Sequence, residues 1–122
     1  MEKKKTIFCD IDGTLFQYRK FESYQTTDCV LLPGVKEKFD EWKSQGHMII
    51  LTTARPEYLR DHTIKELKTH NLLYDRLIME IERGPRYLIN DCDPSKPGKR
   101  ASGINLNRDE GFINQPWEDI NL

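Results

Sequence analysis

The sequence predicts an α/β fold in which a parallel sheet is the middle of three layers, with helices packed on the sheet and no large cap domain. Short apolar runs alternate along the chain with stretches of helical periodicity, which is typical of parallel strands joined by helical crossovers. Three of the apolar runs are followed at once by Asp-x-Asp, Thr-x-Arg and Asn-Asp, as expected where parallel strands end at a binding edge. A chain of 122 residues fits one domain, which we expect to span residues 1–122.

The first strand is expected at residues 6–9, a short β-prone run bounded by charged residues. The stretch that follows its turn, residues 17–32, contains aromatic side chains but shows neither a helical nor a strand period. We interpret these residues as a flap or ordered loop, because the stretch is too short to be a separate cap domain.

A helix should open at residues 33–34, since proline is tolerated in a first helical turn. Gly46 should end this helix, because glycine readily takes the left-handed conformation that follows a helix. The apolar run at residues 48–51 then predicts a second buried strand. Three residues spaced i, i+4 and i+7 define the buried face of the helix: Val35, Phe39 and Trp42.

A second helix is expected from about residue 56 to residue 69, with Asn71 near its end. Two further short apolar segments, residues 77–79 and 87–89, predict additional strands. One stripe of the helix carries the residues expected to face the sheet: Leu59, Thr63 and Leu67.

The last part of the chain, residues 91–122, is expected to be a C-terminal loop with a docking tail. Residues 91–100 are polar and rich in proline, and residues 103–106 could form a last strand. Trp117 and Ile120 are spaced i, i+3, so we expect them to dock the tail on the body of the protein. Docking on a second subunit would give the same pattern, which leaves a homo-oligomer open.

Composition and charge restrict the classes of partner. The chain is 37% hydrophobic and 32% charged with a formal net charge of −1, which is typical of a soluble globular protein. Neither a nucleic-acid partner nor a membrane is indicated, because there is no net positive charge and no apolar run long enough for a signal peptide or a span. The three cysteines form no CxxC pair, so reduced thiols and a cytoplasmic location are expected.

The three polar strand ends predict a phosphate and metal site. Asp10 and Asp12 repel each other unless a cation lies between them, and Mg²⁺ with oxygen ligands, Asp91 among them, is the ordinary solution. The hydroxyls and helix start of residues 52–55 suit a phosphoryl group. Simpler alternatives are that Asp10 and Asp12 cap a turn or a helix start, that a threonine caps the helix beside an exposed Arg55, and that Asp91 and Asp93 form only an Asx-type turn before Pro94.

Together these motifs resemble the haloacid dehalogenase (HAD) superfamily of phosphohydrolases, whose fold is Rossmann-like. The run IFCDIDGTLF matches the first motif of that family, and MIILTTAR and YLINDCD are similar to the second and fourth. The resemblance implies that Asp10 is the nucleophile and that Asp12 is the general acid/base. It also implies Thr53, or else Thr52, as the phosphate-binding hydroxyl, and Asp91 as the third Mg²⁺ ligand, with Asp93 as the alternative.

The chain departs from the family at the third motif, which is usually a lysine. No lysine lies between Lys68 and Lys96, so Arg83 or Arg86 would have to take its place beside the phosphate. Arginine is a rigid fork whereas lysine is a point charge, so the two are not equivalent.

The predicted function is a Mg²⁺-dependent phosphatase that hydrolyses phosphomonoesters through an aspartyl-phosphate, as small capless members of the resembled family do. The first choice of substrate is a sugar phosphate or related small metabolite, with Arg55 and residues 96–100 as candidate contacts for a second anionic group. The alternatives are a nucleotide or nucleic-acid end as substrate, and a non-catalytic phosphate-binding or regulatory domain. A phosphomutase is a weaker third possibility, because little of the chain is available to shield an intermediate from water.

Overall fold

The computed structural model describes residues 4–117 and contains one parallel sheet with two main helices. The elements follow in the order β1 (Thr6–Asp10), η1 (Phe21–Ser23), α1 (Val35–Ser44), β2 (Met48–Thr52), η2 (Glu57–Leu59), α2 (Arg60–Thr69) and β3 (Arg76–Ile78). The strands lie in the order β1-β2-β3, and both pairs are parallel. The α/β class, with a parallel sheet flanked by helices and no large cap, is therefore confirmed.

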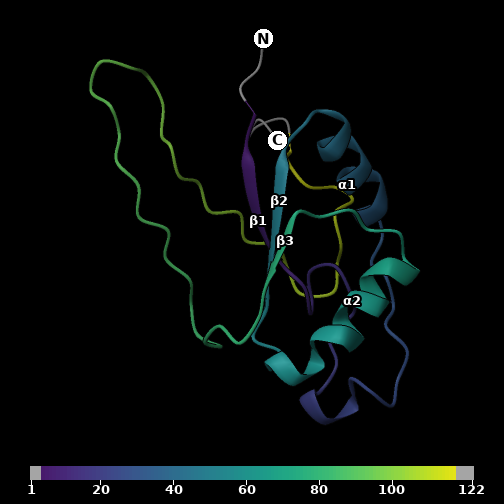
Figure 1. Cartoon of the computed structure of the whole chain (residues 1–122). Coiled ribbons are helices and arrows are strands. Elements are labelled where there is room, and N and C mark those ends of the chain that lie inside the picture. Colours follow the sequence, from purple (N-terminus) through teal and green to yellow (C-terminus); the bar gives the residue numbers. More distant parts are fainter. Residues whose placement is uncertain (1–3, 118–122) are drawn as a thin grey trace.

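One face of the sheet forms the core. Ile7 pairs with Ile49 and Cys9 with Leu51, so these four buried side chains share a face. The opposite face is more open, because Phe8 on β1 is 52% exposed. Figure 1 shows α1 and α2 on the same side of the sheet and the long loop that follows β3 on the other side. Within residues 4–117 no helix covers that other face, so the third layer that the sequence predicted does not form and the helices flank the sheet on one side only.

The first helix is built as its sequence predicts. Val35, Phe39 and Trp42 are all buried against the sheet. Gly46 lies just past the helix with a φ of 82°. Its N–H donates to the Lys43 carbonyl, and the next N–H, of His47, donates to the Trp42 carbonyl. This pattern satisfies carbonyls at the helix end that would otherwise lack a partner.

The second helix is entered through the short η2 turn and ends at Thr69. Asn71 follows with a φ of 55°, and its N–H donates to the Lys68 carbonyl. Asparagine tolerates this left-handed conformation, so it ends α2 as glycine ends α1.

Two predicted strands do not form within the described residues. Neither residues 87–89 nor residues 103–106 have a strand partner. Tyr87 and Ile89 are 89% and 92% exposed. The apolar runs therefore did not predict strands at these two places, and among the described residues β1 pairs with β2 alone, so its other edge is open.

The C-terminal segment docks on the body of the protein, as predicted for Trp117. The Trp117 ring lies against Trp42 and Phe112, and its Nε1 donates to the Phe112 carbonyl at 2.9 Å. Phe112 is itself buried between Trp42 and Phe39. The predicted contact through Ile120 lies outside the described residues.

Candidate functional site

The carboxyl end of β1 presents Asp10 at the edge of the sheet. The tight turn after it is closed by the N–H groups of Leu15 and Phe16, which both donate to the Ile11 carbonyl. Gly13 has a φ of 83°, a conformation that favours glycine. The turn brings the Thr14 hydroxyl back to Asp10, to which it donates at 3.3 Å. The turn therefore fixes the direction in which the Asp10 carboxylate points.

Burial raises the pKa of the Asp10 carboxyl above its ordinary value. The Ile11 N–H and the positive charge of Arg86 act in the opposite direction, and the negative charge of Asp12 adds to the rise. The folded protein therefore disfavours the charged form of Asp10 and would gain from a cation beside it.

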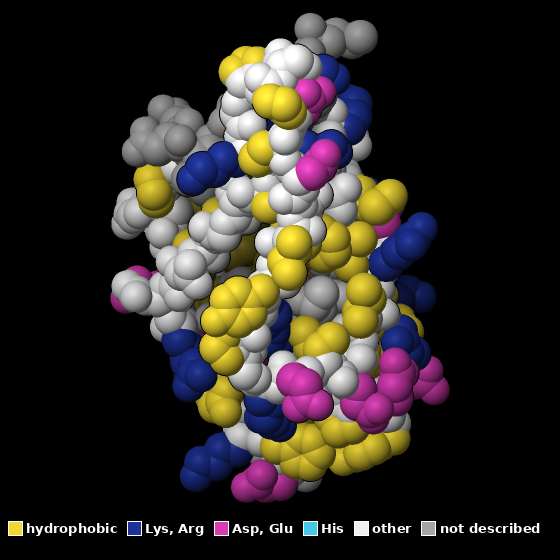
Figure 2. Space-filling model, turned by 90° about the vertical axis from the view of Figure 1, so that its left-hand side faces the viewer, with side chains coloured by type: hydrophobic (Ala, Val, Ile, Leu, Met, Phe, Trp, Pro, Cys, Tyr) yellow, Lys and Arg dark blue, Asp and Glu magenta, His cyan; other side chains and the backbone are white. Residues whose placement is uncertain are grey.

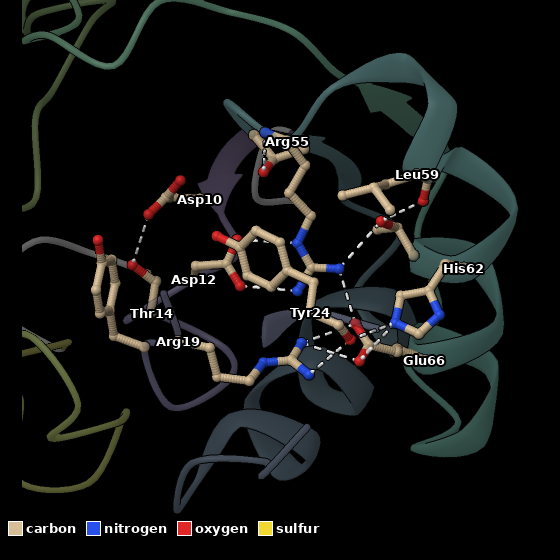
Figure 3. Close-up of polar contacts among 12 residues, drawn as sticks. Asp10, Asp12, Thr14, Arg19, Tyr24, Arg55, Leu59, His62 and Glu66 are labelled. Carbon is tan, nitrogen blue, oxygen red and sulfur yellow. Dashed lines mark hydrogen bonds and ion pairs between the residues drawn. The ribbon is translucent and has the colours of Figure 1, made fainter. Parts of the chain in front are cut away.

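Arg55 holds the second aspartate of the motif. Its Nε donates to Asp12 Oδ2 at 2.9 Å and its Nη2 donates to Asp12 Oδ1 at 2.7 Å, a bidentate pair between the loops after β2 and β1 (Figure 3). Arg55 is 1% exposed, so solvent screens this pair little. A bidentate guanidinium fixes the orientation of a carboxylate as well as its charge.

The remaining contacts of Arg55 lead to α2. Its Nη1 donates to Thr63 Oγ1 at 3.0 Å and to Glu66 Oε1 at 2.7 Å. Burial alone would lower the pKa of the Arg55 guanidinium, but the hydrogen bonds and charges of Asp12 and Glu66 outweigh burial and raise it. Arg55 therefore remains a cation between two carboxylates.

The flap is fastened to the same cluster. Arg19 donates to Glu66 Oε1 at 3.0 Å and to the Thr27 carbonyl at 2.9 Å. The Tyr24 ring lies under the Arg55 guanidinium, 4.4 Å from Cζ to the ring centroid, and the Tyr24 carbonyl contacts His62 Nε2 at 2.7 Å. Burial, together with the charge of Asp12, raises the pKa of Tyr24 to about 12. Figure 3 shows how Asp12, Arg55, Glu66, Arg19 and Tyr24 form one continuous cluster.

Two expectations about this region need correction. Arg55 was predicted to bind phosphate or a second anionic group, but its hydrogen bonds go to Asp12, Thr63 and Glu66, and it is buried. It positions Asp12 instead. The second anionic contact was also placed at residues 96–100, which line a cavity of about 1140 Å³ beside residues 4–8, toward the amino end of β1 and away from Asp10.

The two threonines at the carboxyl end of β2, Thr52 in the strand and Thr53 just after it, take different positions. Thr52 pairs with Asp10 across the sheet, and paired residues of parallel strands point to the same face. Thr53 is 1% exposed, and its hydroxyl oxygen accepts the Arg55 N–H at 3.1 Å. The structure thus brings Thr52 beside Asp10, whereas Thr53 supports the turn that leads to α2.

Arg83 and Arg86 lie on the loop after β3 and are exposed. The charge of Arg86 lowers the pKa of Asp10, which means that this guanidinium lies within electrostatic reach of the carboxyl. Arg83 Cζ lies 5.8 Å from the ring centroid of Phe21 in the flap. Arg86 is thus the better placed of the two to take the position of the third-motif lysine.

Asp91 is not brought to the other two carboxylates. It lies in the long loop that Figure 1 shows beside the sheet, it is exposed, and its carboxylate contacts Arg100 at 3.3 Å. Asp93 accepts hydrogen bonds from the Ser95 N–H at 2.9 Å and the Ser95 hydroxyl at 2.7 Å, which is the Asx-turn alternative. Figure 2 views the molecule from the side on which the loop after β3 lies, and it shows hydrophobic side chains along that face.

The donor set as it stands does not fit Mg²⁺. Both Asp12 oxygens accept hydrogen bonds from Arg55, and Asp91 lies away from Asp10 in the loop. Within residues 4–117, no group of three His, Cys, Asp or Glu side chains is arranged to hold a metal ion. A metal site built from the predicted ligands would need the segment that carries Asp91 to move.

Sequence reasoning missed the part of Glu66 in this cluster. One signal was available, because Glu66 immediately precedes Leu67 and follows Thr63 by three positions, so it falls beside the apolar stripe of α2. A carboxylate buried on such a face requires a partner of opposite charge. The sequence did not show that the partners would be Arg55 and Arg19.

Fold and site together define a member of the HAD superfamily. The profile of the PITM 1-3 LNS2 domain, which has a HAD-like phosphatase fold, matches residues 7–87. This match covers more than half of the chain, and the protein therefore belongs to the LNS2 domain family. No curated protein gives a significant match.

Solved structures with TM-scores above 0.5 share this fold. A chain in a structure of the Pnkp1/Rnl/Hen1 complex is 27% identical with a TM-score of 0.57, and the match covers 68% of this chain and 30% of that one. An MCSG target from Vibrio cholerae is 23% identical with a TM-score of 0.52, covering 75% and 85% of the two chains. The D,D-heptose 1.7-bisphosphate phosphatase from B. bronchiseptica, crystallised with magnesium and phosphate, is 19% identical with a TM-score of 0.44, covering 62% and 49%. The present chain thus spans less than a third of the chain that it matches in the Pnkp1/Rnl/Hen1 complex.

Between residues 4 and 117, neither α1 nor α2 nor any shorter helix has the length and apolar character needed to cross a bilayer.

Proposed function

We propose that this protein is a phosphatase of the HAD type that hydrolyses phosphomonoesters through an aspartyl-phosphate on Asp10. The observation that carries the proposal is the Asp10–Thr14 turn at the carboxyl end of β1, with Thr52 beside Asp10 and the charge of Arg86 within reach. Membership of the LNS2 family, with its HAD-like phosphatase fold, supports the same reaction.

In the first step an Asp10 carboxylate oxygen attacks phosphorus. The bond from phosphorus to the leaving oxygen breaks, and that oxygen takes up a proton. In the second step water attacks phosphorus, phosphate is released and the Asp10 carboxylate is restored. The Thr52 hydroxyl and Arg86 would hold the phosphoryl oxygens and offset the charge that develops on them.

Asp12 would take the proton from the attacking water. Both Asp12 oxygens accept hydrogen bonds from Arg55, which fixes the orientation of the carboxyl group and leaves lone pairs for a water. In the first step Asp12 would give its proton to the leaving oxygen. We therefore propose that Asp12 is the general acid/base of both steps and that Arg55 positions it.

The proposal includes a requirement for Mg²⁺, which Asp10, Asp12 and Asp91 would hold only after the segment that carries Asp91 has moved toward the sheet. Burial without a cation disfavours the charge on Asp10, which supports a need for one. Residues 87–89 are unpaired, and the free edge of β1 is open, so the segment before Asp91 has a place to dock. Bound Mg²⁺ would supply charge neutralisation at the phosphoryl group.

We further place the protein among the small capless members of the superfamily, with residues 17–32 as its cover. The flap is tied to α2 through the Arg19–Glu66 ion pair, and it contributes aromatic side chains rather than a second domain. A homo-oligomer in which a second subunit adds cover is compatible with this proposal. The free cysteines of the described chain suit the reducing cytoplasm that we propose as the compartment.

A sugar phosphate or a related small metabolite is the substrate that we propose first. A phosphorylated nucleic-acid end is the second candidate, and one observation favours it. The chain is 27% identical to a chain in a structure of the Pnkp1/Rnl/Hen1 complex. It matches another structure of that complex equally well, and that structure is described as an RNA repair complex. Release of phosphate from sugar phosphates and from an oligonucleotide with a terminal phosphate separates the two.

The experiment that tests the proposal is phosphate release from p-nitrophenyl phosphate and a panel of phosphorylated metabolites, with and without Mg²⁺ and chelator. We expect turnover that Mg²⁺ supports and that Asp10→Asn abolishes. The control is Asp40→Asn, an exposed aspartate of α1 that pairs with Lys36, and its activity should be unchanged. Turnover undiminished in Asp10→Asn would exclude this mechanism, and phosphate binding without turnover would favour the non-catalytic alternative.

A further inference from the structure

We infer that Arg108 is a substrate-binding residue that accepts a second anionic group, a carboxylate or a second phosphate, on the phosphorylated substrate. The inference rests on the proposed function and names the class of substrate. Arg108 belongs to the C-terminal segment, to which the sequence alone assigned no role in the site.

The backbone around Arg108 is fastened to the Asp10–Thr14 turn. The Asp109 N–H donates to the Gly13 carbonyl at 2.9 Å, and the Asp109 carboxylate accepts the Tyr18 N–H at 2.7 Å. Asp109 has a φ of 66°, a conformation that is uncommon for residues other than glycine. These contacts fix the segment against both the catalytic turn and the start of the flap.

The Arg108 side chain lies directly on Gly13. A Cβ added to Gly13 would come within 3.0 Å of Arg108 Cγ, so the absence of a side chain at Gly13 makes room for the arginine. Its guanidinium Cζ then lies 4.1 Å from the ring centroid of Tyr18. The stem is thus held against Gly13 of the Asp10–Thr14 turn, and the charged end is held by the Tyr18 ring.

The guanidinium of Arg108 has no acidic partner among residues 4–117, since its one described interaction is the stack on Tyr18. An exposed arginine stacked on a ring keeps its planar set of N–H donors available, and that fork suits a carboxylate or a phosphate. Arg55 contrasts with it, because the donors of Arg55 are engaged within the protein.

Other arginines lie near Asp10 and the flap. Arg86 acts electrostatically on Asp10, and Arg83 stacks on Phe21 of the flap, so exposed arginines approach the site from the loop after β3 as well as from the C-terminal segment. The formal net charge of the chain is −1, so the positive charge of these arginines is confined to this region of the surface. One phosphoryl group at Asp10 would engage Arg86, and Arg108 would remain for a second anion.

The test compares substrates that differ by one anionic group. The pairs are glucose 6-phosphate with 6-phosphogluconate, glycerol 1-phosphate with 3-phosphoglycerate, and fructose 6-phosphate with fructose 1,6-bisphosphate. We expect the wild-type protein to prefer the more anionic member of at least one pair in kcat/KM. Arg108→Gln should reduce that preference by about tenfold or more, mainly through KM, because a charged hydrogen bond of this kind is lost. Arg108→Lys should retain part of the preference for the more anionic substrate.

The matched control is Arg76→Gln, an exposed arginine at the opposite, amino end of β3, which should leave the preference unchanged. Equal values of kcat/KM within every pair, or a preference that survives in Arg108→Gln, would overturn the inference. If no compound is turned over, the proposed phosphatase function fails separately. Calorimetric binding of the same pairs then decides the inference, which requires tighter binding of the more anionic member and loss of that difference in Arg108→Gln.

Discussion

The buried cluster around Arg55 makes a strong prediction about stability. Arg55→Met replaces the arginine with an unbranched apolar side chain of similar length. The change removes the hydrogen bonds to Asp12, Thr63 and Glu66. Two carboxylates would then remain in the interior without the cation that lies between them. Removing one partner of a buried ion pair costs about 3–5 kcal/mol, because the remaining charge is left uncompensated. A domain of this size is typically stable by only about 5–15 kcal/mol.

The assay is urea unfolding followed by tryptophan fluorescence, since Trp42 and Trp117 lie in the core cluster. A loss of that size corresponds to a fall in Tm of roughly 10–20 °C. The matched control, Arg60→Ala, removes an exposed ion pair with Glu57 and should change stability far less, because water screens such pairs.

A double variant separates charge from packing. Asp12→Asn in the Arg55→Met background removes one of the stranded carboxylates, so the double variant should be more stable than the sum of the single changes predicts. A coupling of about 1–3 kcal/mol is expected for residues in direct contact. The reasoning is refuted if Arg55→Met costs less than about 1 kcal/mol, or if the two changes are additive.

Two further predictions follow from the carboxylates of the site. Because burial raises the pKa of Asp10, its charged form destabilises the folded protein, so Asp10→Asn should raise Tm at pH 7. The gain should shrink as pH falls through the raised pKa of Asp10 and vanish near the ordinary value of about 3.8; a gain independent of pH would contradict it. Because Asp12 is the proposed general acid, Asp12→Asn should slow the turnover of alkyl phosphates, whose leaving groups need a proton, more than that of aryl phosphates. An equal fall for glycerol 1-phosphate and p-nitrophenyl phosphate in steady-state assays would contradict this assignment.

Much of the fold could be predicted from local sequence patterns. Strand β1, strand β2 and both helices lie close to where the apolar spacing placed them, because each buries one face in a single core. The unpaired residues 87–89 show the limit of this reasoning. An apolar run indicates an extended segment, but whether the segment pairs depends on contacts with β1 that no local pattern encodes.

The sequence predicted which strand ends form the site, but it did not predict which other residues contact them. Asp10, Asp12 and the threonines at the carboxyl end of β2 meet at one edge because parallel strands end together. Arg55 was predicted to face a ligand, yet it turns inward, since Tyr24 from the flap and Glu66 from α2 surround it. Tyr24 lies in a distant part of the sequence and Glu66 lies 11 positions after Arg55, so the cluster forms only when the flap folds against α2.

The position of Phe112 has a consequence for where this domain ends. The profile match stops at residue 87, yet Phe112 is 4% exposed and packs on Phe39 and Trp42, with Trp117 covering it. A fragment cut at the last matched residue would uncover those rings of α1 and be prone to self-association. The shortest fragment that should fold on its own therefore extends at least thirty residues past the last residue of the family match.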